Sequence, residues 1–139
     1  MNASFEEKSV WIQLVSMVVV IGSYFVVVAL MVSKGITNLI AFVPLFIVAV
    51  ALLVIVLIVG HIVAAVASRP ESRDERDRLI EWRAESNSSW ILRVGVLAAI
   101  TGLVVSIDNI WIAHLLLVSM FLSEVARFIF QLVYYRRGI

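Results

Sequence analysis

The chain has 139 residues, of which 63% are hydrophobic, with a formal net charge of +1 and no cysteine. Soluble domains are about half apolar, and a chain this short cannot bury so much apolar surface in one water-soluble core. The composition therefore favours a membrane protein. It excludes a disulfide framework, a thiolate metal site and a cysteine nucleophile.

Four apolar stretches have or approach the length of about 20 residues that a transmembrane helix needs. They cover residues 10–32, 39–67, 90–107 and 111–135. Backbone polar groups in a bilayer must be bonded within each segment, so helices are favoured despite the many valines and isoleucines. The predicted fold is an all-α integral membrane protein, a single membrane domain built as an antiparallel bundle of four transmembrane helices.

The first stretch, residues 10–32, is expected to be retained rather than cleaved as a signal peptide. Its apolar run exceeds the usual length of about 7–15 residues, and no A-x-A-like cleavage site follows. Ser4 and Glu7 have the spacing of a capping box, which predicts a helix start near Phe5.

The second stretch, residues 39–67, is long for a hydrocarbon core about 30 Å thick. A tilt, a kink at Pro44 or protrusion into the cytoplasm would absorb the excess. Gly35 and Asn38 predict a tight turn before it. Asp108 or Asn109 is expected to cap the fourth helix after an equally short connection.

Lys and Arg residues set the expected orientation, because cytoplasmic segments carry an excess of them. Lys34 is the one basic residue in the two short connections. The termini and the middle segment, residues 68–89, hold Lys8, Arg69, Arg73, Arg76, Arg78, Arg83, Arg136 and Arg137, and Arg93 follows just inside the third span. Both termini and the middle segment are therefore predicted to be cytoplasmic.

The middle segment, residues 68–89, is predicted to form a short amphipathic helix between spans two and three, starting at Pro70 and the Ser72/Glu75 pair. One helix face collects acids that are expected to face the cytoplasm and dock a basic protein partner: Asp74, Asp77, Glu81 and Glu85. The other side is expected to lie at the membrane interface, with Arg76, Arg83 and Trp82. A solvated, ion-paired helix is the alternative. Metal binding is disfavoured because no His interleaves the acids, and direct nucleic-acid binding because the acids would repel phosphate.

The string DERDRLIEWRAE resembles a D-E-R-D-x-x-I-x-x-x-A pattern that precedes the third span in small, largely uncharacterised bacterial and archaeal four-helix membrane proteins. The matching residues are Asp74, Glu75, Arg76, Asp77, Ile80 and Ala84. The resemblance covers about a dozen residues of the chain. It implies four spans, a cytoplasmic middle helix and a location in the cytoplasmic membrane of a bacterium or archaeon, and it supplies no activity.

Polar residues inside the spans are the main functional candidates, because an ionisable group there is costly. Glu124 and Arg127 share a face with Gln131 on the fourth span, and His61 lies at a similar depth in the second. A bundle would join these with Gln13 and Tyr24 of the first span in one intramembrane polar network. The Glu124/Arg127 pair is expected to lock the bundle, to couple protons or ions, or to engage another membrane subunit. Arg127 can snorkel, so Glu124→Ala is expected to destabilise more than Arg127→Ala.

A stripe of small residues on the third span predicts close helix packing, within the bundle or between subunits: Gly95, Ala99, Gly102 and Ser106. Arg93 projects away from this stripe and is expected to snorkel to the headgroups. His114 is expected to be an interfacial or packed histidine.

No phosphate loop, zinc motif or Ser–His–Asp arrangement occurs, so neither an enzyme nor a cofactor is expected. The favoured function is a non-enzymatic membrane interaction or regulatory protein, binding a cytosolic partner or a larger membrane complex, or a second copy of itself. The alternative is a small oligomeric transporter or channel that uses Glu124, Arg127 and His61.

Overall fold

The computed structural model describes residues 5–67 and 74–138 as four long α-helices and one short 3-10 helix, with no strand in these ranges. The elements are α1 (Phe5–Ser33), η1 (Leu39–Phe42), α2 (Val43–Ala67), α3 (Glu75–Val104) and α4 (Asn109–Arg137). Four segments, with η1 and α2 counted as one, are long and apolar enough to cross a membrane. The predicted all-helical fold with four such segments is confirmed.

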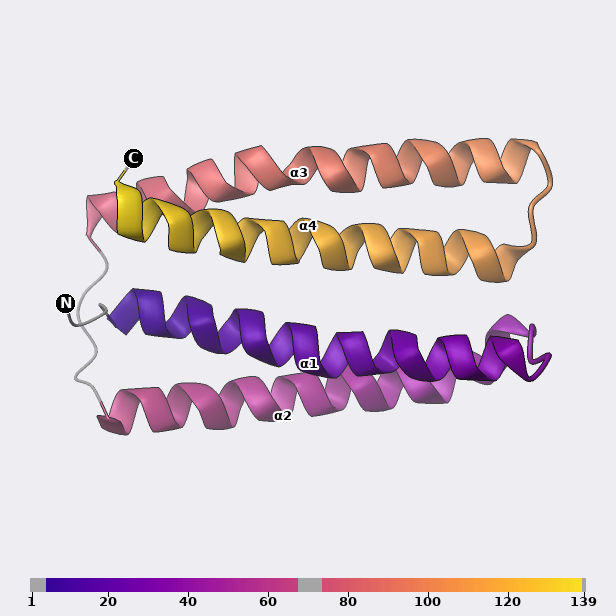
Figure 1. Cartoon of the computed structure of the whole chain (residues 1–139), viewed down its shortest axis with the longest axis horizontal. Helices are drawn as coiled ribbons and strands as arrows, with labels where there is room; N and C mark the ends of the chain where they lie inside the picture. Colours follow the sequence, from indigo (N-terminus) through magenta and orange to yellow (C-terminus); the bar gives the residue numbers. More distant parts are fainter. Residues whose placement is uncertain (1–4, 68–73, 139) are drawn as a thin grey trace.

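The helices run antiparallel in the spatial order α3, α4, α1, α2 (Figure 1). Helix α4 packs against both α3 and α1, and α1 packs against both α4 and α2, whereas α2 and α3 form no comparable interface. The two helix pairs that short connections join, α1 with α2 and α3 with α4, are packed neighbours. We call the end where α1 begins and α4 ends the basal end, and the opposite end, with the two short connections, the distal end.

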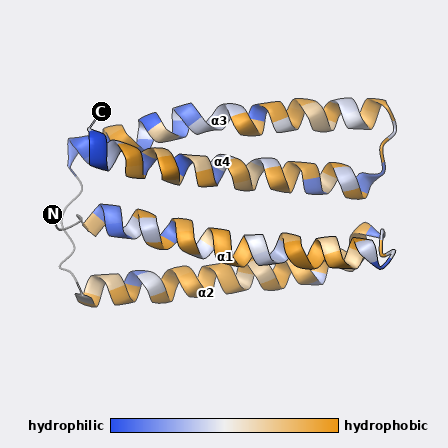
Figure 2. Ribbon diagram, viewed as in Figure 1, coloured by the Kyte–Doolittle hydropathy of each residue, from blue (hydrophilic) through white to orange (hydrophobic). Residues whose placement is uncertain are grey.

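Apolar residues cover most of the helix surfaces, and hydrophilic residues gather at the basal ends of α3 and α4 (Figure 2). Helix α2 is the extreme case. Among its described side chains, only Ala49 and Ala64 are buried. An apolar surface of this extent is typical of lipid contact and not of a soluble monomer.

The turn between α1 and η1 matches the sequence expectation, whereas the start of α4 matches it only in part, because Asp108 is the N-cap residue but its side chain makes no capping hydrogen bond. Gly35 has a φ of 84° in the turn after α1, and the Asn38 side chain accepts a 3.1 Å hydrogen bond from the Ile40 amide to cap η1. Pro44 is the second residue of α2. Its missing N–H falls among the first-turn amides that have no helical partner, so Pro44 starts a helix here and does not need to kink one.

Helix α3 runs without a break from Glu75 to Val104. A separate amphipathic helix before span three was expected, but the charged segment and the apolar span form one helix of 30 residues. Asp74 is the N-cap, and its side chain and that of Asp77 bond each other's backbone amides in a capping box. Ser72 and Pro70, expected at the helix start, lie outside the described residues, as does Ser4 before α1.

Small residues bring α3 and α4 close together. Gly95, Ala99 and Gly102 are buried, and a Cβ on Gly95 would collide with the Ser119 side chain of α4. Nearer the basal end, Ser123 of α4 donates a 3.2 Å hydrogen bond to the Ser88 carbonyl. The small stripe therefore serves packing within the bundle, one of the two predicted uses.

Ser106 does not belong to this stripe. It lies beyond the end of α3, in the connection to α4, is exposed and has a φ of 60°. The helical periodicity that grouped it with Gly102 ends at Val104.

Candidate functional site

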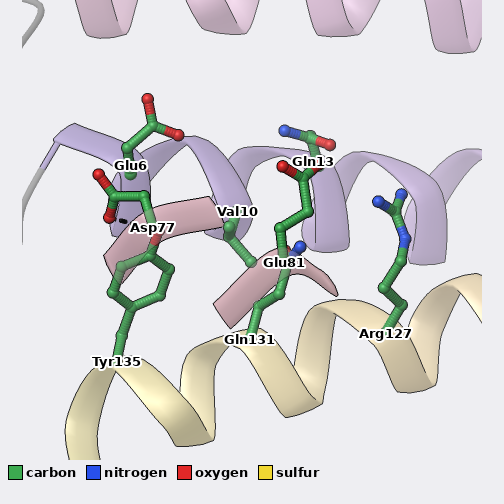
Figure 3. Close-up of a pocket in the computed structure, with 8 residues that line it drawn as sticks. All are labelled: Glu6, Val10, Gln13, Asp77, Glu81, Arg127, Gln131 and Tyr135. Atoms are coloured by element: carbon green, nitrogen blue, oxygen red, sulfur yellow. Dashed lines mark hydrogen bonds between the residues drawn. The ribbon is translucent and has the colours of Figure 1, made fainter. Parts of the chain in front are cut away.

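A polar cavity lies at the basal end, where α1, α3 and α4 meet (Figure 3). Its volume is about 50 Å³, room for one or two water molecules at about 30 Å³ each and far below the pockets of about 300 Å³ or more that hold organic ligands. The lining residues are Glu6, Val10 and Gln13 of α1, Asp77 and Glu81 of α3, and Arg127, Gln131 and Tyr135 of α4. They supply three carboxyl groups and one guanidinium.

Helix α3 turns two of its acids inward. Asp77 and Glu81 are partly buried, and Asp77 Oδ1 accepts a 3.0 Å hydrogen bond from the Tyr135 hydroxyl. Asp74 and Glu85 are exposed. The expectation of one outward acidic stripe is thus wrong for Asp77 and Glu81, because the face that packs on α4 includes them.

Glu124 and Arg127 form the expected ion pair close to the middle of α4. Arg127 Nη2 lies 2.5 Å and Nε 3.0 Å from Glu124 Oε2, and the guanidinium also stands 4.6 Å from the centroid of the Phe128 ring. The side chains remain 22% exposed for Arg127 and 37% for Glu124. Gln131, one turn further along, is buried. The pair is therefore well bonded but only partly covered by its own chain.

His61 belongs to a separate hydrogen-bonded chain between α1 and α2. Its Nδ1 lies 2.7 Å from the Leu57 carbonyl and therefore carries the proton. Its Nε2 lies 3.0 Å from the Ser9 hydroxyl, which in turn accepts a 3.2 Å bond from the Gln13 amide. The resulting order is Gln13 to Ser9 to His61 to Leu57, and only Gln13 also lines the basal cavity.

Tyr24 pairs with His114, which is a packed histidine outside the predicted network. Its hydroxyl lies 3.2 Å from His114 Nε2 of α4, and His114 Nδ1 lies 2.8 Å from the Ile110 carbonyl. The expected single network is therefore divided. One part is at the basal end, and the Tyr24–His114 pair lies apart from it in the distal half.

The two histidines are held in the same way. Each has Nδ1 bonded to the carbonyl four residues earlier and Nε2 facing a hydroxyl of α1. The bond from each histidine to the carbonyl four residues earlier could be predicted, because any helix brings these two groups close together. The pairs Tyr24–His114 and Ser9–His61 could not be predicted, because they depend on which helices are neighbours.

The residues expected at the membrane interface, Arg76, Trp82, Arg83 and Arg93, are all exposed on α3. Trp82 is 66% exposed, and its exposure leaves it free to sit at a headgroup boundary. Among the residues that the structure describes, no group of three or more His, Cys, Asp or Glu side chains has an arrangement that could hold a metal ion.

Comparison of the chain with protein-family models, curated proteins and solved structures found no match. The D-E-R-D resemblance therefore stays a prediction. In the structure its Ile80 and Ala84 are fully buried against the bundle, and its Asp74 and Asp77 form the α3 capping box. These residues have packing and capping roles in the chain itself.

Proposed function

We propose that the chain is a non-enzymatic integral membrane protein with its basal end in the cytoplasm, and that it acts by binding another protein subunit within the membrane. Four apolar helical segments support insertion, and the Lys and Arg residues at the basal end support the orientation. A single Lys, Lys34, lies in the distal connections.

The observation that carries this proposal is the partial exposure of the Glu124–Arg127 pair at the middle of a membrane-length helix. A charged side chain at that depth costs roughly 2.5–3.5 kcal/mol on insertion scales. Pairing lowers that cost, but 37% of the Glu124 side chain stays uncovered in a single chain. A second subunit could cover the exposed part of the Glu124–Arg127 pair with polar groups and so shield both charges from lipid.

A membrane subunit fits the geometry better than a basic cytosolic partner. Such a partner was expected to bind the acids of α3, but Asp77 already accepts bonds from Tyr135 and from the Asp74 amide. Glu81 lines the basal cavity. Only Asp74 and Glu85 of that set are exposed, which leaves too little acidic surface for docking by charge alone.

The test is quantitative co-purification from native membranes in mild detergent. The wild type should recover a partner, or further copies of itself, at a fixed stoichiometry. The double variant Glu124→Gln/Arg127→Gln removes both charges and keeps polar, unbranched side chains at the two positions, and it should lose that partner while keeping its helix content. Arg93→Gln is the matched control, because Arg93 is exposed on α3. Equal recovery by all three proteins would reject the pair as the binding element.

A small oligomeric transporter is the second candidate. Its support is Glu124, an ionisable side chain near the middle of a membrane-length helix, paired with Arg127 of the basal cavity. Ionisable side chains inside membrane spans often mark proton or ion pathways. Proteoliposome flux of protons, ions or cationic drugs that Glu124→Gln abolishes without unfolding would support it, and no flux would reject it.

A further inference from the structure

An apolar groove of about 490 Å³ opens in the distal half of the bundle. Residues from α1, η1, α2, α3 and α4 line it. It exists because α2 and α3 do not pack against each other along their lengths. Leu92 of α3 and Phe46 of α2 stand among the lining residues, with α4 contributing Leu117 and Met120.

The polar atoms of this groove are already bonded. Tyr24 and His114 are its two polar lining residues, and they face each other at 3.2 Å. His114 Nδ1 is occupied by the Ile110 carbonyl. A ligand with donors or acceptors would gain nothing here and would lose its hydration, so the groove selects hydrocarbon.

The depth of the groove corresponds to one half of a bilayer. Its α4 residues run from Ala113 to Met120, with α4 starting at Asn109. At about 1.5 Å per residue, this interval lies about 6–17 Å from the distal helix end. One leaflet contributes about 15 Å to a hydrocarbon core of about 30 Å, so the groove lies at the depth of the acyl chains of the distal leaflet.

The length does not suit a spanning helix. The groove runs along about 11 Å of α4, whereas a partner helix that crosses the membrane would follow the bundle along about 30 Å. We infer that the groove binds one acyl chain of a lipid from the distal leaflet. This inference rests on the membrane insertion stated in the proposed function.

The test uses the full chain in vesicles of phosphatidylcholine and phosphatidylglycerol that contain a lipid with a photoreactive diazirine in its acyl chain. After irradiation, peptide mass spectrometry locates the labels. The labels should concentrate on Leu92, Leu117 and Met120. They should be several-fold weaker on Leu97 and Ile100, which are 65% and 52% exposed but lie outside the groove.

A variant that narrows the groove gives a second readout. Leu116→Trp adds bulk at a lining residue and should lower the groove labelling several-fold. Leu97→Trp, with the same change outside the groove, should leave it unaltered. If Leu116→Trp fails to fold, the labelling pattern of the wild type is sufficient to test whether an acyl chain occupies the groove.

Two results would overturn the inference. One is labelling that simply follows exposure around the whole bundle, and the other is a protein–protein adduct at Leu92 or Met120, which would put a second polypeptide in the groove. Glu124→Gln/Arg127→Gln separates the two proposals. It should lose the protein partner and keep the groove labelling, so the failure of one proposal is distinguishable from the failure of the other.

Discussion

The Tyr135 hydroxyl donates a 3.0 Å hydrogen bond to Asp77 Oδ1, which joins the last turns of α4 to the first turn of α3. The other Asp77 oxygen accepts a 3.1 Å bond from the Asp74 amide. One carboxylate therefore both caps α3 and fastens it to α4. This fixes the charged segment of the chain to the bundle instead of leaving it free on the membrane surface.

Removing the Tyr135 hydroxyl should destabilise the basal end. A hydrogen bond to a charged group contributes about 1.5–3 kcal/mol, and we expect Tyr135→Phe to lose the lower part of this range because the bond is only partly buried. Tyr134→Phe is the matched control, since its hydroxyl bonds Asn87 in an exposed position. Thermal unfolding in nanodiscs should rank Tyr135→Phe below Tyr134→Phe, and equal midpoints would contradict the proposed fastening.

Adding one methyl group at Gly95 should weaken the contact between α3 and α4. Gly95→Ala puts a Cβ into the Ser119 side chain, and overpacking of this kind costs about 1–3 kcal/mol. The double variant Gly95→Ala/Ser119→Gly should recover part of the loss. Gly22→Ala should cost nothing, because nothing lies within 4 Å of a Cβ there. Denaturant titration in mixed micelles measures all of these, and equal stability of Gly95→Ala and Gly22→Ala would contradict the close approach.

Arg127→Ala should destabilise the bundle more than Glu124→Ala, the reverse of the order expected from snorkelling alone. Arg127 is the one cation among the eight described residues that line the basal cavity, and three of the others are acids. Its loss leaves Glu124 unpaired and removes the positive charge beside those carboxyl groups. Glu124→Ala leaves Arg127 beside the same acids. Unfolding midpoints in the same nanodisc measure the difference, and a lower midpoint for Glu124→Ala would restore the first expectation.

The apolar runs predicted the helices and their approximate limits, because length and hydropathy determine them locally. The orientation of Asp77 and Glu81 was missed because the charged segment was treated as a helix separate from span three. Gly95 and Ala99 follow these acids by 18 residues, about five turns at 3.6 residues per turn. In one continuous helix, Asp77 therefore lies on the same face as Gly95, and Glu81 on the same face as Ala99, which is the buried face. The sequence contained this spacing.

The contacts between helices could not be predicted in the same way. Nothing local to His114 indicates that α1 lies beside α4, or that α2 stays away from α3. These relationships depend on how whole helix faces fit, such as Gly95 against Ser119, and a single sequence gives the residue sizes without the partners. The apolar groove exists because α2 and α3 do not pack against each other, so it could not be predicted from the sequence either.

The His61 chain can be tested by removing its partners singly and together. Ser9→Ala leaves His61 Nε2 without its 3.0 Å partner. An unsatisfied acceptor costs about 1–3 kcal/mol when it is buried, and we expect the lower part of this range because His61 is only partly buried. His61→Leu with Ser9→Ala removes both partners and should recover much of that loss, because apolar groups replace the bonded pair. A double-mutant cycle of unfolding free energies measures the coupling. Additive losses would show that the two side chains do not interact.

The central claim is that the Glu124–Arg127 pair is covered by another protein subunit in the membrane. The most direct measurement is the native mass of the complex taken from its own membrane into nanodiscs without detergent. We predict a mass above the 15.5 kDa of one chain by a whole number of subunits, and a return to one chain for Glu124→Gln/Arg127→Gln. A wild-type protein found only at 15.5 kDa would contradict the claim.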